Sequence, residues 1–457
     1  MARAQTPVAA RTRQGIKLSN GNNKSRVDLK AIVWRTLSIV ILASLVNYVT
    51  SWRYKQKKAA YEAHAGTHAN TADAVHDWTR GLPKNCVLVD WKSLGVRNAQ
   101  DPWKNATEIF TPGHTFSHAE PVFQIFDRGF LDILGDAPSI QLIAENNAYM
   151  FAHEAPIWYP PTDEVFMCSN AGHPPSSLER TNVLSKLSLQ EAAAKGTATV
   201  TEIQPIPTLE MTNGGTLFMD KLLFVNSGRG STFPPTLALV EPLPPYNSTV
   251  ILDNYFGMQF NSLNDAKVHP VSKAIFFTDP TYGDVGNFRP PPQLPRQVYR
   301  FDAETGEIRV VADGFSMPNG PAFSPDGRTA YLADSGSAWK GGYDSTRPQT
   351  IYAFDVDSDL RAQTWLNRRV FAYVDTGIPD GLVLDTKGNL YAATGDGVHV
   401  FSPRGILLGK IFIGSTSANI AFAGKGRLVV LAETKVFLVK FAAEGMSLDF
   451  WGMSRAS

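Results

Sequence analysis

The chain has 457 residues, with 43 lysines and arginines against 42 aspartates and glutamates, which leaves a formal charge of +1. This near-neutral balance provides no basic field for nucleic acid, and two cysteines exclude both a disulfide-rich scaffold and a four-cysteine zinc site. With 43% hydrophobic residues, 36 glycines and 30 prolines, the composition predicts a large core of short strands joined by tight turns.

The first fifty residues differ from the rest of the chain. Residues 1–30 are polar and basic, and the apolar stretch from Ala31 to Thr50 is long enough to span a bilayer. We therefore expect a basic tail over 1–30, a transmembrane signal-anchor helix over 31–50 and a stalk or outer strap over 51–109. A cleaved signal peptide, which would leave a secreted protein, is the alternative, although its basic region would be unusually long.

The charges around the apolar stretch predict its orientation. Eight lysines and arginines up to Arg35 precede the apolar core and four follow it, which favours a cytoplasmic N-terminus and a luminal or extracellular body. Two glycosylation sequons, at Asn105 and Asn247, agree with that orientation. In such a compartment Cys86 and Cys168 either pair or stay reduced.

Residues 110–457 contain six copies of one pattern, an apolar or aromatic segment that ends in small polar residues. The copies start 38 to 60 residues apart, at Val165, Leu222, Ile275, Ala330, Leu390 and Leu428. This spacing is typical of four-stranded blades with loops of varied length. The sequence therefore predicts an all-β fold, a six-bladed β-propeller, over 110–457.

A polar residue precedes each copy by 9 to 11 residues. These residues are Glu154, Asn213, Asn264, Asn319, Asp380 and Asn419. Equivalent positions of successive blades face one another across the central channel, so we expect these side chains to converge near its axis. The simpler interpretation is that the Asn-Gly and Asp-Gly pairs among them are turns.

The chemistry of this polar set favours a calcium ion. It contains two carboxylates and several amide oxygens but no histidine or thiol, which fits Ca²⁺ better than zinc or copper. Another acidic stretch, Asp355–Asp359, lacks the glycine and the final acid of a linear calcium loop and is interpreted as a hairpin turn. No Gly-x-Ser-x-Gly elbow, phosphate-binding loop or dinucleotide motif is present.

Short motifs spread over the body point to a family. They include Glu154-Ala-Pro, Leu263-Asn-Asp265, Met317-Pro-Asn-Gly320, Ser324-Pro-Asp-Gly327, Ile378-Pro-Asp-Gly381 and Asn254-Tyr-Phe-Gly257. Together they resemble the gluconolactonase/regucalcin family and, within it, the fungal lactonohydrolases. The resemblance implies a six-bladed propeller with a lactone-hydrolysing site above one calcium ion, whose ligands would be Glu154, Asn264, Asn319 and Asp380.

On this basis we expect hydrolysis of a lactone to its hydroxy acid by water, with Asp380 as the first candidate for the general base and Glu154 as the second. The candidate substrate-binding residues are Asn213, Asp279, Tyr282 and Asn419. Two alternatives stay open: a related propeller hydrolase or biosynthetic enzyme that acts on another metabolite, and a non-catalytic binding propeller with a structural metal.

Overall fold

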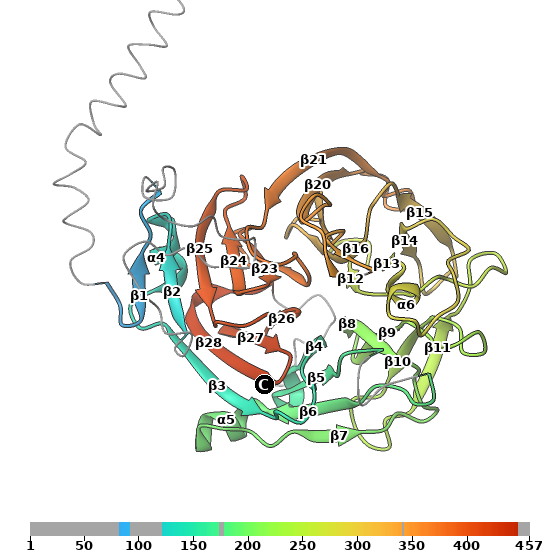
Figure 1. Ribbon diagram of the computed structural model, residues 1–457, viewed down its shortest axis with the longest axis horizontal. Helices are drawn as coiled ribbons and strands as arrows, with labels where there is room; N and C mark the ends of the chain where they lie inside the picture. The colour runs from blue at the N-terminus through green and yellow to red at the C-terminus, as the bar shows by residue number, and fades with distance from the viewer. Residues whose placement is uncertain (1–81, 92–120, 173–177, 341, 447–457) are drawn as a thin grey trace, which may run out of the picture. The chain divides into compact units, whose positions relative to one another are not determined.

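The computed structural model describes residues 82–91, 121–172, 178–340 and 342–446. These residues form six sheets arranged as the blades of a propeller around a central channel (Figure 1), which confirms the predicted fold. The helix predicted from Ala31 to Thr50 and the sequon at Asn105 lie outside the described residues and stay predictions. Within the described part of the chain, no helix is both long and apolar enough to cross a membrane.

Three blades each consist of four antiparallel strands that follow one another in the chain. From the channel outward they are β4 (Glu154–Tyr159), β5 (Glu164–Cys168), β6 (Leu184–Ser188) and β7 (Thr201–Ile203); β8 (Thr212–Phe218), β9 (Lys221–Asn226), β10 (Thr236–Val240) and β11 (Ser248–Leu252); and β12 (Ala266–Val268), β13 (Ile275–Asp279), β14 (Gln297–Phe301) and β15 (Ile308–Ala312). A fourth blade has the same order but encloses the small hairpin β18 (Ala338–Trp339) and β19 (Gly342–Tyr343). Its strands are β16 (Pro318–Phe323), β17 (Thr329–Asp334), β20 (Thr350–Val356) and β21 (Trp365–Tyr373).

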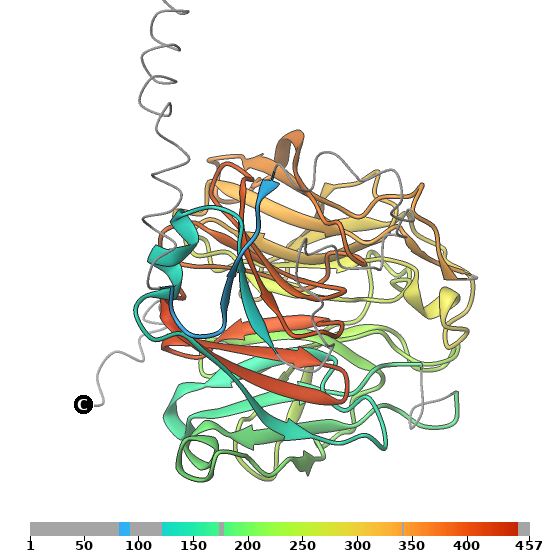
Figure 2. The same cartoon turned by 60° about the vertical axis from the view of Figure 1, so that its left-hand side comes forward.

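The last two blades combine strands from distant parts of the chain. One blade contains β26 (Asn419–Phe422), β27 (Lys425–Ala432) and β28 (Lys435–Glu444) and is completed by β3 (Ser139–Glu145). The other contains β22 (Leu382–Leu384), β23 (Leu390–Thr394), β24 (Gly397–Phe401) and β25 (Leu407–Phe412), followed by β2 (Val122–Ile125) and β1 (Cys86–Leu88). Figure 1 and Figure 2 both show β1, in blue, at the outer edge of its sheet. Part of the segment expected to be a stalk therefore belongs to a blade.

The six sequence copies correspond to the second strand of each blade: β5, β9, β13, β17, β23 and β27. These strands are buried on both faces because each blade is covered by its neighbours, which explains why they read as continuous apolar runs. Phe166 of β5 and Phe224 of β9, for example, belong to one core cluster between adjacent blades.

Short helices decorate the loops: α4 (Gly129–Leu134), the one-turn helix η1 (Pro160–Thr162), α5 (Leu189–Lys195) and α6 (Tyr282–Val285). The longest of them, α5, follows directly after β6. Its N-terminus is capped by Ser188, whose hydroxyl accepts a hydrogen bond from Glu191 N (3.2 Å).

Glycine is required where the inner strands approach one another. A Cβ atom on Gly214 would lie 2.3 Å from Asp265 Oδ1, which is too close for two non-bonded atoms. A Cβ atom on Gly320 would lie 2.5 Å from Asp380 O, and a Cβ atom on Gly381 would lie 2.1 Å from Asn419 Oδ1. None of these three glycines has a positive φ. The Asn-Gly and Asp-Gly pairs are therefore not turns; the glycine allows neighbouring inner strands to pack closely around the channel.

A buried ion network joins β24 and β25 to the loop after β21. Lys410 Nζ lies 2.8 Å from Asp375 Oδ1 and 3.1 Å from Asp396 Oδ2, and its side chain is 3% exposed. His399 Nε2 lies 2.7 Å from Asp396 Oδ1. Burial alone would raise the pKa of Asp396, but the charges of His399 and Lys410 outweigh it and hold that pKa well below its usual range.

Both cysteines are free thiols. Cys168 is buried and its Sγ contacts Thr212 O and Asn213 O at 3.2 Å. Asn247, the sequon within the described residues, is exposed, and its glycosylation stays a prediction.

Candidate functional site

The six polar residues expected in the channel lie at the starts of the six inner strands. Glu154 and Asn419 begin β4 and β26, Asn213 and Asn319 are the second residues of β8 and β16, and Asn264 and Asp380 lie two residues before β12 and β22. Neighbouring starts are bonded to each other: Gly214 N donates to Asn264 O (2.6 Å) and Gly381 N donates to Ala418 O (2.9 Å). All six side chains are at most 9% exposed. The structure thus gathers them at one end of the channel.

Irregular backbone aims several of these side chains. The pairing of β4 with β5, of β8 with β9 and of β16 with β17 shifts register just after Glu154, Thr212 and Pro318. Ala155, next to Glu154, has a φ of 53°, in the left-handed region. Such bulges turn a side chain away from the regular alternation of the strand, and here they fall at the channel positions.

Two amides are held with their oxygens free. Asn264 Nδ2 donates to Asn213 Oδ1 (2.9 Å), and Asn319 Nδ2 donates to the Tyr282 hydroxyl (3.3 Å). The Oδ1 atoms of Asn264 and Asn319 are buried and accept no hydrogen bond. A buried carbonyl oxygen without a partner costs free energy. Two such oxygens in neighbouring blades therefore indicate that the channel binds a ligand, such as a cation, that is coordinated by oxygen atoms.

The two predicted carboxylates differ in their contacts. Glu154 is 1% exposed and its Oε2 accepts a hydrogen bond from Asn419 Nδ2 (2.6 Å). Asp380 is 9% exposed and its Oδ1, although buried, has no hydrogen-bond partner. Asp380 therefore has the more available oxygen of the two.

A third carboxylate, Asp265, was not among the predicted site residues. It is completely buried; its Oδ1 accepts from Ala266 N (2.8 Å), and its Oδ2 lies 3.7 Å from Lys267 Nζ. Its position directly after Asn264 in the Leu-Asn-Asp motif was the available signal. A residue that follows a channel residue is normally expected to point the other way, which is why the alternation rule did not select it.

These carboxylates raise one another's pKa. The pKa of Glu154 is raised well above its ordinary value, first by burial and then by the charge of Asp380. The pKa of Asp380 is raised by burial and by the charges of Asp265 and Glu433. Asp265 has a lysine nearby, Lys267 at 3.7 Å, but a single lysine cannot balance three buried carboxylates. The electrostatics of the channel therefore favour a further cation.

A histidine–glutamate pair borders this set and was also missed. His153 Nδ1 lies 2.9 Å from Glu433 Oε1, where β27 ends, and His153 directly precedes Glu154. Burial lowers the pKa of His153, but the charge of Glu433 outweighs it and the net shift is upward. Histidines in a propeller have many structural roles, so the sequence offered no signal beyond the neighbouring Glu154.

Asp279, a candidate for substrate binding, is completely buried. Its Oδ2 accepts from Asn261 N (3.0 Å) and its Oδ1 from Ser262 N (2.8 Å). Burial raises the pKa of Asp279 to about 7, although these hydrogen bonds oppose the shift. Its carboxylate thus fixes the loop that leads to Asn264.

The donor set fits a hard cation. Within the segments that the structure describes, no three histidine, cysteine, aspartate or glutamate side chains form a metal site by themselves, so a cation here would depend on asparagine oxygens as well. The unpartnered oxygens of Asn264, Asn319 and Asp380, together with Glu154, supply oxygen ligands only. Calcium is the cation that accepts such irregular, all-oxygen sets. The hairpin at Asp355–Asp359 is instead closed by its own bonds, such as that from Asp359 N to Asp357 Oδ1 (3.0 Å).

Comparisons with known proteins show the family of the chain. The profile of the SMP-30/Gluconolactonase/LRE-like region matches residues 235–433. A lactonohydrolase of Aspergillus oryzae, oryL, is 33% identical over 322 residues, which cover 65% of this chain and 68% of that protein. A gluconolactonase of Zymomonas mobilis is 32% identical over 203 residues, which cover 42% of this chain and 53% of that protein.

Solved structures show the same fold. A gluconolactonase from Xanthomonas campestris superimposes with a TM-score of 0.55 at 25% identity and covers 70% of this chain and 95% of its own. A luciferin-regenerating enzyme superimposes with a TM-score of 0.51 at 17% identity and covers 68% of this chain and 98% of its own.

Proposed function

The chain belongs to the SMP-30/gluconolactonase/LRE-like family of lactone hydrolases, and we propose that it is a calcium-dependent lactonohydrolase that opens a lactone to its hydroxy acid. The observation that carries the proposal is the group of unpartnered buried oxygens beside two carboxylates in the channel. In a propeller without a ligand at this position, burying these groups without partners would only lower the stability of the fold.

We assign four ligands to the ion: Glu154, Asn264, Asn319 and Asp380. When bound, calcium supplies a Lewis acid that polarises the lactone carbonyl and stabilises negative charge on its oxygen.

Asp380 is our choice of general base. Glu154, the second candidate, is less exposed than Asp380, and its Oε2 already accepts a hydrogen bond from Asn419 Nδ2. The Asp380 carboxylate accepts a proton from the water that attacks the carbonyl carbon. The ring C–O bond then breaks, and that proton passes to the departing ring oxygen, which becomes the hydroxyl group of the product.

The residues first expected to bind substrate have a second role in this arrangement. Asn213, Tyr282 and Asn419 each form a hydrogen bond with one of the assigned ligands. We propose that they orient those ligands, as partners outside the coordination shell commonly do in metal sites.

Tyr282→Phe tests this positioning role. Without the phenol oxygen, the Asn319 amide loses the partner that keeps its Oδ1 toward the channel, so we expect calcium affinity to fall about tenfold. Calcium titration by calorimetry measures the change. The matched control is Tyr391→Phe, which removes a buried hydroxyl that donates to Asp385 Oδ2 (3.2 Å) away from the channel. Equal calcium affinity in the Tyr282 variant and the wild type would contradict the positioning role.

The proposed function is tested on the full chain with a small panel of lactones: pantolactone, gluconolactone and an aromatic lactone. We expect turnover of at least one lactone, a loss of at least tenfold after chelation, and recovery on addition of calcium. Turnover that survives complete removal of metal would contradict the calcium-dependent mechanism. A tightly bound calcium without turnover of any lactone would favour the alternative of a binding propeller with a structural metal.

A further inference from the structure

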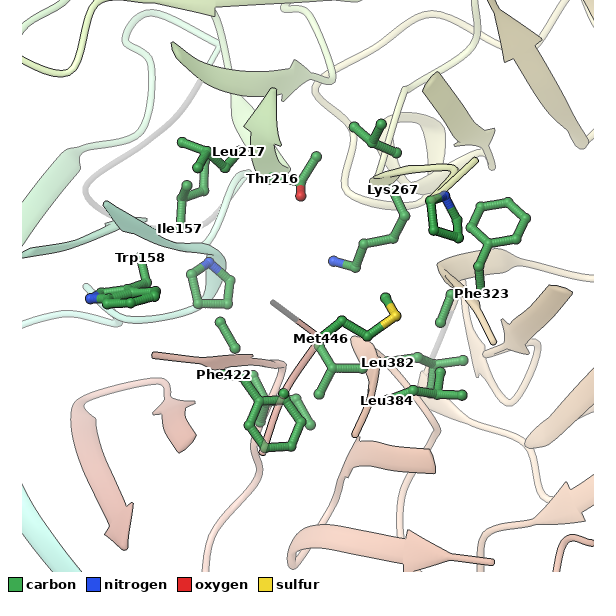
Figure 3. A pocket seen from close by; sticks show the side chains of 18 of the residues that line it. Ile157, Trp158, Thr216, Leu217, Lys267, Phe323, Leu382, Leu384, Phe422 and Met446 are labelled. Carbon is green, nitrogen blue, oxygen red and sulfur yellow. The ribbon is translucent and has the colours of Figure 1, made fainter. Parts of the chain in front are cut away.

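The channel has a second hollow at the end opposite the candidate site. Its volume is about 490 Å³, and it is lined by residues where the inner strands end, whereas the site lies where those strands begin. Figure 3 shows Leu217, Phe323, Leu384 and Phe422 around this cavity, each from a different blade. Its volume lies within the range of cavities that bind small molecules.

Most of the lining is apolar, and one cation reaches into it. Figure 3 shows the Lys267 side chain pointing into the hollow, where the Thr216 side chain also points. The Lys267 side chain is 18% exposed, and its ammonium lies 3.7 Å from Asp265 Oδ2, beyond direct hydrogen-bond distance. The ammonium therefore has donors available to a ligand in the cavity.

Most of the charged side chains that line the cavity are positive. Lys273 and Lys425 also line it, and Lys425 is paired with Glu444 (2.7 Å). Among the lining residues Glu444 is the one carboxylate, so the wall carries more positive than negative charge. A cationic ligand would be repelled. An uncharged ligand would leave the ammonium with Asp265 Oδ2, 3.7 Å away, as its anionic partner but without a direct charge-assisted hydrogen bond.

We propose that this cavity binds an apolar small molecule that carries a single carboxylate, with its hydrocarbon part against the strand ends and its carboxylate on Lys267. The pairing is a charge-assisted hydrogen bond in a largely apolar surrounding, which is stronger than its counterpart in water. The cavity lies at the other end of the channel from Asn264 and Asp380, although Lys267 also contacts Asp265 of the candidate site. The binding is measured without a lactone, so its outcome does not depend on the proposed function.

The experiment uses calorimetry to measure the affinity of the full chain for octanoate and for octanamide. The two probes share size and hydrocarbon chain and differ in charge, so octanoate is expected to bind at least tenfold more tightly. Equal affinity, or no binding of octanoate, would overturn the proposal. No substitution is needed for this comparison.

Two variants locate the binding. Lys267→Met should weaken octanoate binding at least tenfold, whereas Lys440→Met, which removes an exposed lysine on β28, should leave it unchanged. Thr216→Phe should block the cavity by volume, whereas Val250→Phe on the exposed face of β11 should not. Octanoate binding that both cavity variants retain would overturn the assignment.

Met446 also lines the hollow, and residues 447–457 follow it in the sequence. The same titration on a chain without residues 447–457 separates a ligand site from a site for that segment. Binding of octanoate only after their removal would assign the cavity to the chain's own C-terminal segment and overturn the proposal. Equal affinity with and without them supports it.

Discussion

Asp380→Asn should lower kcat/KM for the lactone substrate by about a thousandfold, within the range for loss of a general base. The substitution keeps the shape of the side chain and its Oδ1 atom but removes the group that accepts the proton from water. It also removes a buried negative charge that lies close enough to Asp265 and Glu433 for their charges to raise its pKa. We therefore expect the metal-free variant to unfold at the same urea concentration as the wild type or at a higher one.

The matched control for this prediction is Asp357→Asn. Asp357 lies in the hairpin turn that we considered as a linear calcium loop, where its Oδ1 accepts from Asp359 N. Its replacement should leave kcat/KM and calcium affinity unchanged. Full activity in the Asp380 variant would remove Asp380 from the chemical step and transfer the role of base to Glu154.

Lys410→Met should lower the free energy of unfolding by about 3 kcal/mol, because the buried carboxylate of Asp396 loses one of its two cationic partners. Asp396 is 1% exposed and keeps His399 Nε2 at 2.7 Å, so the loss lies at the lower end of the range for a broken buried pair. Methionine fills a similar volume, so the loss comes from charge and not from a cavity. Urea denaturation at neutral pH measures the difference.

The contribution of Asp396 to the free energy of unfolding should change with pH in a definite direction. The folded pKa of Asp396 lies below its ordinary value of 3.8, so ionised Asp396 stabilises the wild-type fold above about pH 4 and loses this effect as the pH falls further. The difference in the free energy of unfolding between the wild type and Lys410→Met should therefore become smaller at acidic pH. The control is Lys425→Met, which breaks an exposed pair with Glu444 and should cost at most about 1 kcal/mol. Equal costs for the two variants would contradict the assigned role of the network.

The blade pattern was predictable because each second strand is buried on both faces and therefore apolar throughout. The strands that complete the last two blades were not. Val122–Ile125 and Ser139–Glu145 pair with strands that lie roughly 300 residues later, and local periodicity contains no information about such partners. Cys86–Leu88 joins the first of these sheets through its pairing with Val122–Ile125.

The candidate site also contains residues that the sequence predicted and residues that it did not. Glu154, Asn319 and Asp380 were selected because they recur at one position of a repeat, and the structure places their side chains together. Asp265 and the His153–Glu433 pair lie beside those positions and belong to no repeat. The Leu-Asn-Asp motif was the one sequence signal for Asp265, and the contacts in the structure show that these residues border the site.

The pairing of β28 with β3 has a consequence for biosynthesis. It joins segments roughly 300 residues apart, a long-range contact of the kind that slows folding. The ribosome synthesises the chain from its N-terminus onward, so β3 has no partner strand until β28 has been made. The four assigned oxygen ligands lie between Glu154 and Asp380 in the sequence, so no chain that ends before Asp380 can hold the complete set. A nascent chain would thus expose the unpaired edge of β3 for most of its synthesis, and it would hold all four ligands before β3 acquires its partner strand.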